Sequence, residues 1–147
     1  MNRKEFLSDF GRMGFAGVAL SLFPWLESCT EKAQQEVSGE RARIGIIGTG
    51  SRGLFHIQHL VQMPNVDVVA LCDNYRPHLE DAAQYYPEAK QYDDYRRLLD
   101  DKAVQGVIIT TPLYLHARMT IDALRAGKRV FCEKSMAFTL DEALEVY

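Results

Sequence analysis

Three glycines lie between an apolar segment and an amphipathic segment in the first half of the chain. Gly48, Gly50 and Gly53 form the pattern G-x-G-x-x-G between a β-branched run, 43–47, and a helical pattern, 54–63. In such a pattern the first glycine permits a tight turn, the second lets a ligand approach the backbone, and the third lets the helix pack closely against the strand. The helix start also offers free N–H groups to phosphate. The spacing therefore predicts a pyrophosphate-binding turn, and we include the intervening Thr49, Ser51 and Arg52 in it.

A carboxylate stands at the end of the next apolar run. Asp73 follows the run 66–71, about 20 residues after the glycines, where it is placed to accept hydrogen bonds from ribose hydroxyls. A carboxylate in this position repels a 2′-phosphate, which favours NAD over NADP. Arg76 is near enough in sequence to bind that phosphate instead. NADP therefore stays an alternative, although it is the less favoured cofactor. The alternative is a glycine turn and a solvated aspartate in an α/β protein that binds no nucleotide.

Short apolar runs alternate with longer amphipathic ones along the rest of the chain. The predicted strands are 43–47, 66–71, 90–92, 107–109 and 129–132. The predicted helices are 54–63, 77–86, 93–99, 113–126 and one that begins at Thr139, with Glu142 completing a capping box and Gly127 ending the helix before it. Apolar strands separated by helices predict an α/β fold with a doubly wound parallel sheet of Rossmann type. A ligand would bind at the carboxyl ends of its strands.

The segments 43–60, 66–73 and 107–143 resemble, in this order, the N-terminal domain of the Gfo/Idh/MocA oxidoreductases, the family of glucose-fructose oxidoreductase and inositol dehydrogenase. The resemblance implies a dinucleotide-binding domain over 41–147. It also implies that the substrate-binding sheet and the acid/base element lie in a C-terminal domain outside this chain. The Rossmann domain is thus expected to be incomplete and not to complete catalysis alone, and longer relatives are expected to form oligomers.

The family's T-P-x-x-x-H element is present as Thr111, Pro112 and His116. By resemblance, its backbone passes the nicotinamide half of the cofactor, so these residues are predicted to bind it. For His116 the alternative is a structural role, capping the helix start and packing under the loop.

The family's E-K-P element appears as Glu133, Lys134 and Ser135. The resemblance places Glu133 and Lys134 in the cofactor site and directs Lys134 towards the nicotinamide and the substrate. Relatives commonly have a cis bond before the proline. Because a cis peptide before another residue costs about 2.5–4 kcal/mol, we expect a trans bond before Ser135.

The implied reaction is hydride transfer between NAD(P) and a hydroxyl-bearing carbon of a sugar or polyol. It requires a base for the hydroxyl proton and a cation that favours the alkoxide, a role that Lys134 could take. One alternative is an NAD-dependent glycosidase that oxidises its sugar transiently; such relatives usually depart from E-K-P, so CEKSMAF (132–138) favours the oxidoreductase. A second alternative is a non-catalytic dinucleotide-binding module or remnant.

The first forty residues differ in character from the rest. Residues 1–29 are predicted to be a signal peptide, because Arg3 and Lys4 precede a short apolar run. The start is similar to a twin-arginine signal, and the ending at Cys29 is similar to a bacterial lipobox, which predicts a lipid anchor there. Residues 30–40 are polar and predicted to be a tether. We therefore expect a protein exported to the bacterial periplasm or anchored in a membrane.

Composition narrows the remaining classes. The net charge of −3 comes without clustering of basic residues, which argues against nucleic acid as a partner. The chain has three cysteines, and their spacing indicates neither a metal site nor a disulfide framework. Cys72 and Cys132 close predicted strands and are expected to be small core residues.

Overall fold

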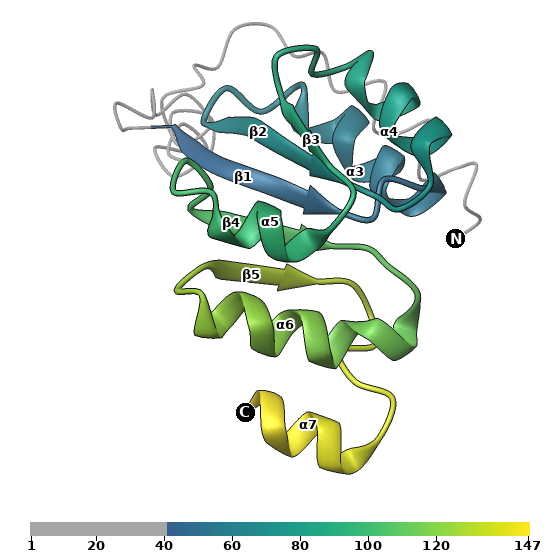
Figure 1. The fold of residues 1–147 in the computed structure, drawn as a ribbon, viewed down its shortest axis with the longest axis vertical. Coiled ribbons are helices and arrows are strands. Elements are labelled where there is room, and N and C mark those ends of the chain that lie inside the picture. The colour runs from purple at the N-terminus through teal and green to yellow at the C-terminus, as the bar shows by residue number, and fades with distance from the viewer. Residues whose placement is uncertain (1–40) are drawn as a thin grey trace, which may run out of the picture. The chain divides into compact units, whose positions relative to one another are not determined.

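Five parallel strands form the centre of residues 41–147, the part of the chain that the computed structural model describes (Figure 1). The strands are β1 (Ala42–Ile47), β2 (Val66–Cys72), β3 (Lys90–Tyr92), β4 (Gly106–Ile109) and β5 (Arg129–Cys132). The helices are α3 (Ser51–Leu60), α4 (Arg76–Ala83), α5 (Tyr95–Asp100), α6 (His116–Arg125) and α7 (Leu140–Val146), with a 3-10 helix η3 (Leu113–Leu115). The predicted alternation of strands and helices is confirmed.

The sheet has the order β3-β2-β1-β4-β5, and every neighbouring pair is parallel. The chain moves outward from β1 through β2 to β3, then crosses to β4 on the other side of β1 and continues to β5. The direction of winding thus reverses between β1 and β4. In doubly wound sheets this reversal leaves a crevice at the carboxyl ends of the strands, where ligands bind.

Both faces of the sheet are covered, and a separate apolar core lies on each. Ile46 packs in the cluster with α3 and α4, whereas Ile47, the next residue of β1, packs in the cluster with α5 and α6. Successive side chains of a strand point to opposite faces, so a strand between two helical layers must be apolar along its length. Burial of both faces of the sheet therefore explains why the strand segments are continuous apolar runs in the sequence. Cys72 belongs to the second cluster as predicted, and its burial raises the pKa of its thiol to about 12.

Helix ends follow local sequence signals. The Thr139 side chain accepts a hydrogen bond from the Glu142 N–H, and the Glu142 carboxylate accepts one from the Thr139 N–H, so the predicted capping box is confirmed. Gly127 follows α6 with a φ of +72°. One difference from prediction lies in 113–126, which begins with the 3-10 turn η3 before α6 starts at His116. There the Leu115 N–H donates to the Pro112 carbonyl at 2.9 Å and closes the tighter turn.

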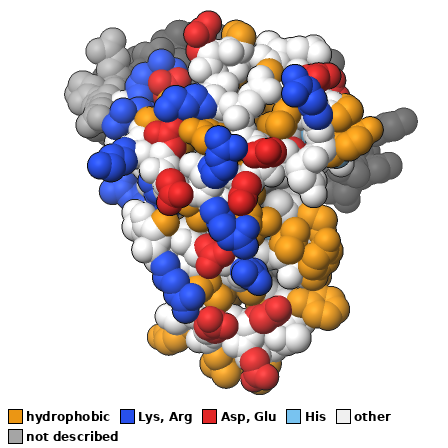
Figure 2. All heavy atoms as spheres, in the orientation of Figure 1, with side chains coloured by type: hydrophobic (Ala, Val, Ile, Leu, Met, Phe, Trp, Pro, Cys, Tyr) orange, Lys and Arg blue, Asp and Glu red, His pale blue; other side chains and the backbone are white. Residues whose placement is uncertain are grey.

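Charged side chains of both signs are interspersed on the face in Figure 2, while hydrophobic side chains gather near the loops that follow β4 and β5. Exposed apolar residues of these loops include Leu113, Tyr114, Met136 and Phe138.

The predictions for the signal peptide 1–29, the lipid anchor at Cys29 and the tether 30–40 lie outside the described residues. Within residues 41–147, no helix has the length and apolar character needed to cross a membrane.

Candidate functional site

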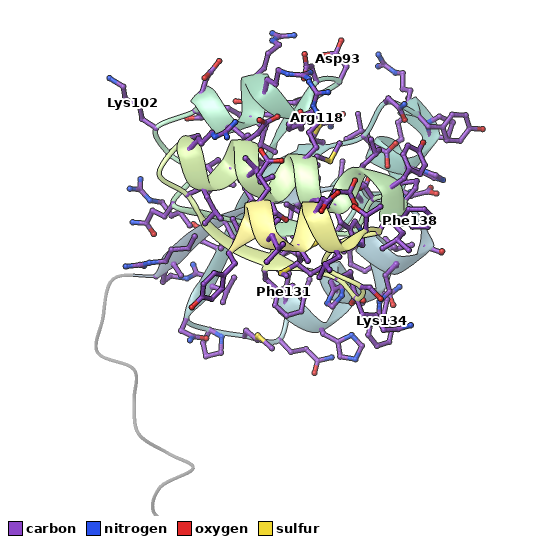
Figure 3. The ribbon with its side chains drawn as sticks, turned by 90° about the horizontal axis from the view of Figure 1, so that it is seen from below. Asp93, Lys102, Arg118, Phe131, Lys134 and Phe138 are labelled. Atoms are coloured by element: carbon purple, nitrogen blue, oxygen red, sulfur yellow. The ribbon has the colours of Figure 1, made fainter. Side chains whose placement is uncertain are left out.

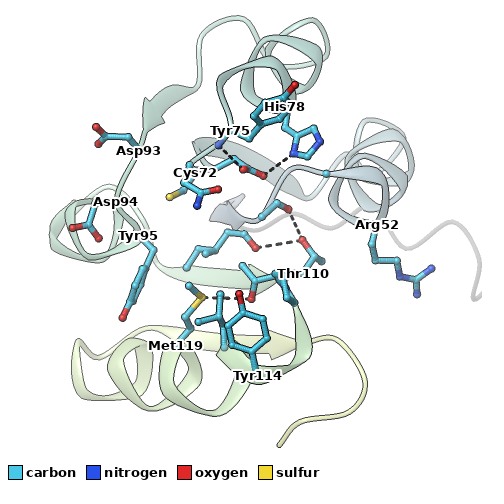
Figure 4. A pocket seen from close by; sticks show the side chains of 18 of the residues that line it. Arg52, Cys72, Tyr75, His78, Asp93, Asp94, Tyr95, Thr110, Tyr114 and Met119 are labelled. Atoms are coloured by element: carbon cyan, nitrogen blue, oxygen red, sulfur yellow. Dashed lines mark hydrogen bonds and ion pairs between the residues drawn. The ribbon is translucent and has the colours of Figure 1, made fainter. Parts of the chain in front are cut away.

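A cavity of about 830 Å³ lies at the carboxyl edge of the sheet, where the direction of winding reverses (Figure 4). The loops after β1, β2 and β4 line it, together with the start of α5. Its lining includes seven of the predicted site residues: Gly48, Gly50, Ser51, Arg52, Asp73, Thr111 and Pro112. The other six lie outside the lining: Thr49, Gly53, Arg76, His116, Glu133 and Lys134.

Packing requires two of the three glycines in the turn. Gly48 has a φ of +90°, and a Cβ atom there would lie 2.9 Å from the backbone nitrogen of Thr111. A Cβ on Gly53 would lie 2.0 Å from the carbonyl oxygen of Gly48, which leaves no room for a side chain. Gly50 differs, because a Cβ atom there would have the His78 ring as its nearest neighbour, at 3.3 Å, and this ring also lines the cavity. The turn is thus held closed at Gly48 and Gly53 and stays open towards the cavity at Gly50.

Side chains that directly follow β2 and β4 fix the glycine turn. The Thr110 hydroxyl donates a hydrogen bond to the Gly48 carbonyl. The Thr49 N–H donates to Oδ2 of Asp73 at 2.8 Å, and Thr49 itself is buried. The Tyr75 N–H donates to Oδ1 of Asp73 at 2.9 Å. Asp73 therefore joins the turn after β1 to the loop after β2, and its carboxylate stays at the cavity wall.

The residues present fit a dinucleotide. Helix α3 begins at the cavity, and the first N–H groups of a helix have no partner within that helix, so they are available to phosphate. The absence of a Cβ on Gly50 lets a phosphate approach them. Asp73 supplies a carboxylate of the kind that accepts ribose hydroxyls, and the cavity volume is in the range of small-molecule sites.

Arg76 lies outside this cavity. Its side chain is 86% exposed and pairs with Glu80 one turn along α4, with Nε 3.0 Å from Oε1. The predicted alternative, in which Arg76 binds a 2′-phosphate, would require it to leave this surface pair.

His116 is buried and joins two loops. Its Nε2 lies 2.7 Å from the Thr111 carbonyl oxygen, and its Nδ1 lies 2.8 Å from the Ser135 carbonyl oxygen. Both ring nitrogens are thereby engaged with the protein. The ring connects the loop after β4 to the loop after β5, a structural role like the alternative considered for this residue.

A buried carboxylate connects α3 to the loop after β5. Oε1 of Glu133 accepts hydrogen bonds from Arg52 Nε at 2.8 Å and from His56 Nε2 at 2.7 Å. Oε2 accepts one from the Lys134 N–H at 3.2 Å. The hydrogen bond from Arg52, and then that from His56, lowers the pKa of Glu133 to about 2. The sequence predicted Glu133 as a site residue but did not predict its pairing with Arg52, which lies 81 positions earlier in the chain.

The peptide bond between Lys134 and Ser135 is cis, so the predicted trans bond is wrong. The groups on both sides of this bond are held by neighbours: the Lys134 N–H by Glu133 and the Ser135 carbonyl by His116. These tertiary contacts override the local preference for trans. Figure 3 shows Lys134 and Phe138 at the outside of the domain, near the start of α7.

Several residues that line the cavity had no motif to mark them. They are Tyr75, His78, Asp93, Asp94, Tyr95 and Tyr114. A usable signal exists for Asp93 and Asp94, because they follow β3 and the carboxyl ends of parallel strands share one edge. Within residues 41–147, no group of three or more His, Cys, Asp or Glu side chains is arranged to hold a metal ion.

The parallel sheet, the glycine turn at its reversal point and the carboxylate after β2 together define a dinucleotide-binding domain of Rossmann type. Residues 42–147 match the family model described as "Oxidoreductase family, NAD-binding Rossmann fold". The chain therefore belongs to the Gfo/Idh/MocA oxidoreductase family, and residues 42–147 form that family's NAD-binding Rossmann domain.

Three similar proteins illustrate this relationship. A glycosyl hydrolase family 109 protein of Shewanella pealeana is 30% identical over 99% of this chain and 36% of its own length. Inositol 2-dehydrogenase of Salmonella typhimurium is 41% identical over 71% of this chain and 32% of its own length. The crystal structure of myo-inositol dehydrogenase from Lactobacillus casei in complex with NAD(H) and myo-inositol is 31% identical, with a TM-score of 0.69 over 72% of this chain and 32% of that one. The chain thus spans about a third of the length of these proteins.

The charge of Glu133 should stabilise the domain. Near neutral pH we expect Glu133→Gln to lower the free energy of unfolding by about 1.5–3 kcal/mol, the range for hydrogen bonds to a charged group. Because the folded-state pKa is about 2 against an ordinary value of 4.5, this contribution is complete above pH 4.5 and is lost as the pH falls towards 2. Urea unfolding of the native chain and of Glu133→Gln, at a series of pH values from neutral into this acid range, measures the difference in their free energy of unfolding.

Glu80→Gln is the matched control, because Glu80 forms an exposed pair with Arg76 on α4. Its effect should stay within about 0.5 kcal/mol at every pH. A difference between Glu133→Gln and the native chain that does not shrink in acid would contradict the role of the charge.

Proposed function

We propose that this chain supplies the NAD-binding part of an enzyme that transfers hydride between NAD and a hydroxyl-bearing carbon of a sugar or polyol. The observation that carries the proposal is the cavity that brings the glycine turn and Asp73 together at the carboxyl edge. The names of two relatives support the substrate class, since both are inositol dehydrogenases. Bound NAD would supply the acceptor for the hydride.

The residues of this chain would divide the binding task. The N-terminus of α3 and the backbone at Gly50 would hold the pyrophosphate, and Asp73 the adenosine ribose. The loop at Thr111 and Pro112 would flank the nicotinamide half. Lys134 would be the cation that favours an alkoxide on the substrate, and the base would come from residues outside this chain.

A second candidate function is an NAD-dependent glycosidase, in which the sugar is oxidised transiently and reduced again after the glycosidic bond has broken. One observation favours it: the similarity to the family 109 protein extends over 99% of the chain, including the first forty residues, whereas that to the Salmonella dehydrogenase covers 71%. The CEKSMAF segment, which retains Glu133 and Lys134, favours the dehydrogenase instead.

Turnover by the full-length protein distinguishes these functions. A dehydrogenase should accumulate NADH, seen by absorbance, in step with oxidation of inositol or another polyol. A glycosidase should release nitrophenol from nitrophenyl glycosides with no net NADH, because the cofactor is restored in each cycle. NAD binding without either activity would favour a non-catalytic module and contradict the proposal.

We also propose that the protein is exported and that Cys29 carries a lipid. Support comes from the basic start, the short apolar run and the lipobox-like ending at Cys29 in the sequence. Most of the native protein should then be found in the membrane fraction of cells that express it. Cys29→Ser should release it, with Cys72→Ser as the control that does not. Equal distribution of native protein and Cys29→Ser would count against the anchor.

A further inference from the structure

One oxygen of the Asp73 carboxylate, Oδ2, has no spare acceptor position. Oδ2 receives the Thr49 N–H at 2.8 Å and lies 3.4 Å from the Thr49 hydroxyl and 3.3 Å from Nδ1 of His78. Oδ1 receives the Tyr75 N–H at 2.9 Å. An ionised carboxylate offers about four lone-pair positions. Two of these positions belong to each oxygen, and Oδ1 has one contact whereas Oδ2 has three. One of the three contacts to Oδ2 must therefore give way before that oxygen can accept a ribose hydroxyl.

His78 is the partner that can leave. The Thr49 and Tyr75 N–H groups belong to the backbone of the loops that Asp73 holds in place, and Thr49 is 1% exposed. The Thr49 hydroxyl is fixed by the same burial. The His78 side chain, in contrast, is 43% exposed, extends from the first turn of α4, and makes a long contact with Asp73. Figure 4 shows this ring at the cavity wall, with the contact drawn as a dashed line.

The position of the ring bears on the phosphates as well as on the ribose. A Cβ built on Gly50 would lie 3.3 Å from Cε1 of His78, so the ring covers the glycine that faces the cavity. The Tyr75 ring packs edge-on against it, with 4.8 Å between centroids. Asp73 is the acidic group in direct contact with His78. The remaining charged side chains that line the cavity are Arg52, Asp93, Asp94 and Arg96.

We propose that His78 is a specificity-determining residue of the cofactor site, a role that rests on NAD binding at Asp73. The neutral ring yields its contact with Asp73 to a ribose hydroxyl. The protonated ring holds the carboxylate more strongly, because the hydrogen bond is then charge-assisted. It also places a cation beside the Asp73 carboxylate, which by itself would repel a 2′-phosphate.

The two protonation states thus have opposite effects on the two cofactors. Histidine side chains take up a proton as the pH falls from about 8 to about 5. Over this range NAD should bind more weakly, because protonated His78 competes for Asp73, while NADP gains a partner for its phosphate. The preference for NAD over NADP should therefore decrease in acid.

Calorimetric titration of the full chain with NAD and with NADP, at about pH 8 and about pH 5.5, tests the role of His78. As the pH falls, the ratio of the Kd for NADP to the Kd for NAD should decrease about fivefold more in the native chain than in His78→Gln. This factor corresponds to the free energy of a partly exposed charge interaction. His78→Ala should behave as His78→Gln does. The 2′-phosphate itself titrates in this range, but equally for every variant.

His59→Gln is the matched control, because His59 lies in the last turn of α3 and bonds the Phe55 carbonyl. It should retain the native pH dependence. If His78→Gln and His78→Ala bind both cofactors with the native pH dependence, His78 has no role in specificity. If the native chain fails to bind NAD at all, both the cofactor site and the role of His78 are overturned.

Discussion

The arrangement of the site depends on how closely helix α3 approaches the turn after β1. Gly53 lies so near the Gly48 carbonyl that an added Cβ would fall 2.0 Å from it. This approach places the N-terminus of α3 at the carboxyl edge of the sheet, between β1 and β4. The helix therefore directs its unpaired N–H groups into the cavity, and the loops after β2 and β4 are fastened to the same turn through Asp73 and Thr110.

Polar contacts between loops then hold the edge together as one unit. Asp73 joins the turn after β1 to the loop after β2, and Glu133 joins α3 to the loop after β5. His116 connects the loops after β4 and β5. Each of these side chains bonds to backbone or charged groups from another loop, so a change in one loop is transmitted to its neighbours. The site residues supplied by separate strands are thereby kept in fixed relation.

The parts of the structure that the sequence predicted are those set by local pattern. The apolar runs predicted the strands, the Thr139 and Glu142 pair predicted a capping box, and the glycine spacing predicted the turn. The cis bond at Ser135, the pairing of Arg52 with Glu133 and the contact of His78 with Asp73 were not predicted. They depend on which loops meet at the sheet edge, and no short-range pattern encodes that meeting. His78 in particular has no motif around it, and only its position above Gly50 marks it.

Hydrogen–deuterium exchange of the chain with and without NAD tests the central claim, that the carboxyl edge of this sheet holds the dinucleotide. NAD should slow exchange in 48–54, 73–78 and 110–115, because the ligand covers the loops that line the cavity. Exchange in α7 and in the turn 101–105, at the opposite edge, should not change. Protection centred on 101–105, or no protection anywhere at saturating NAD, would contradict the account.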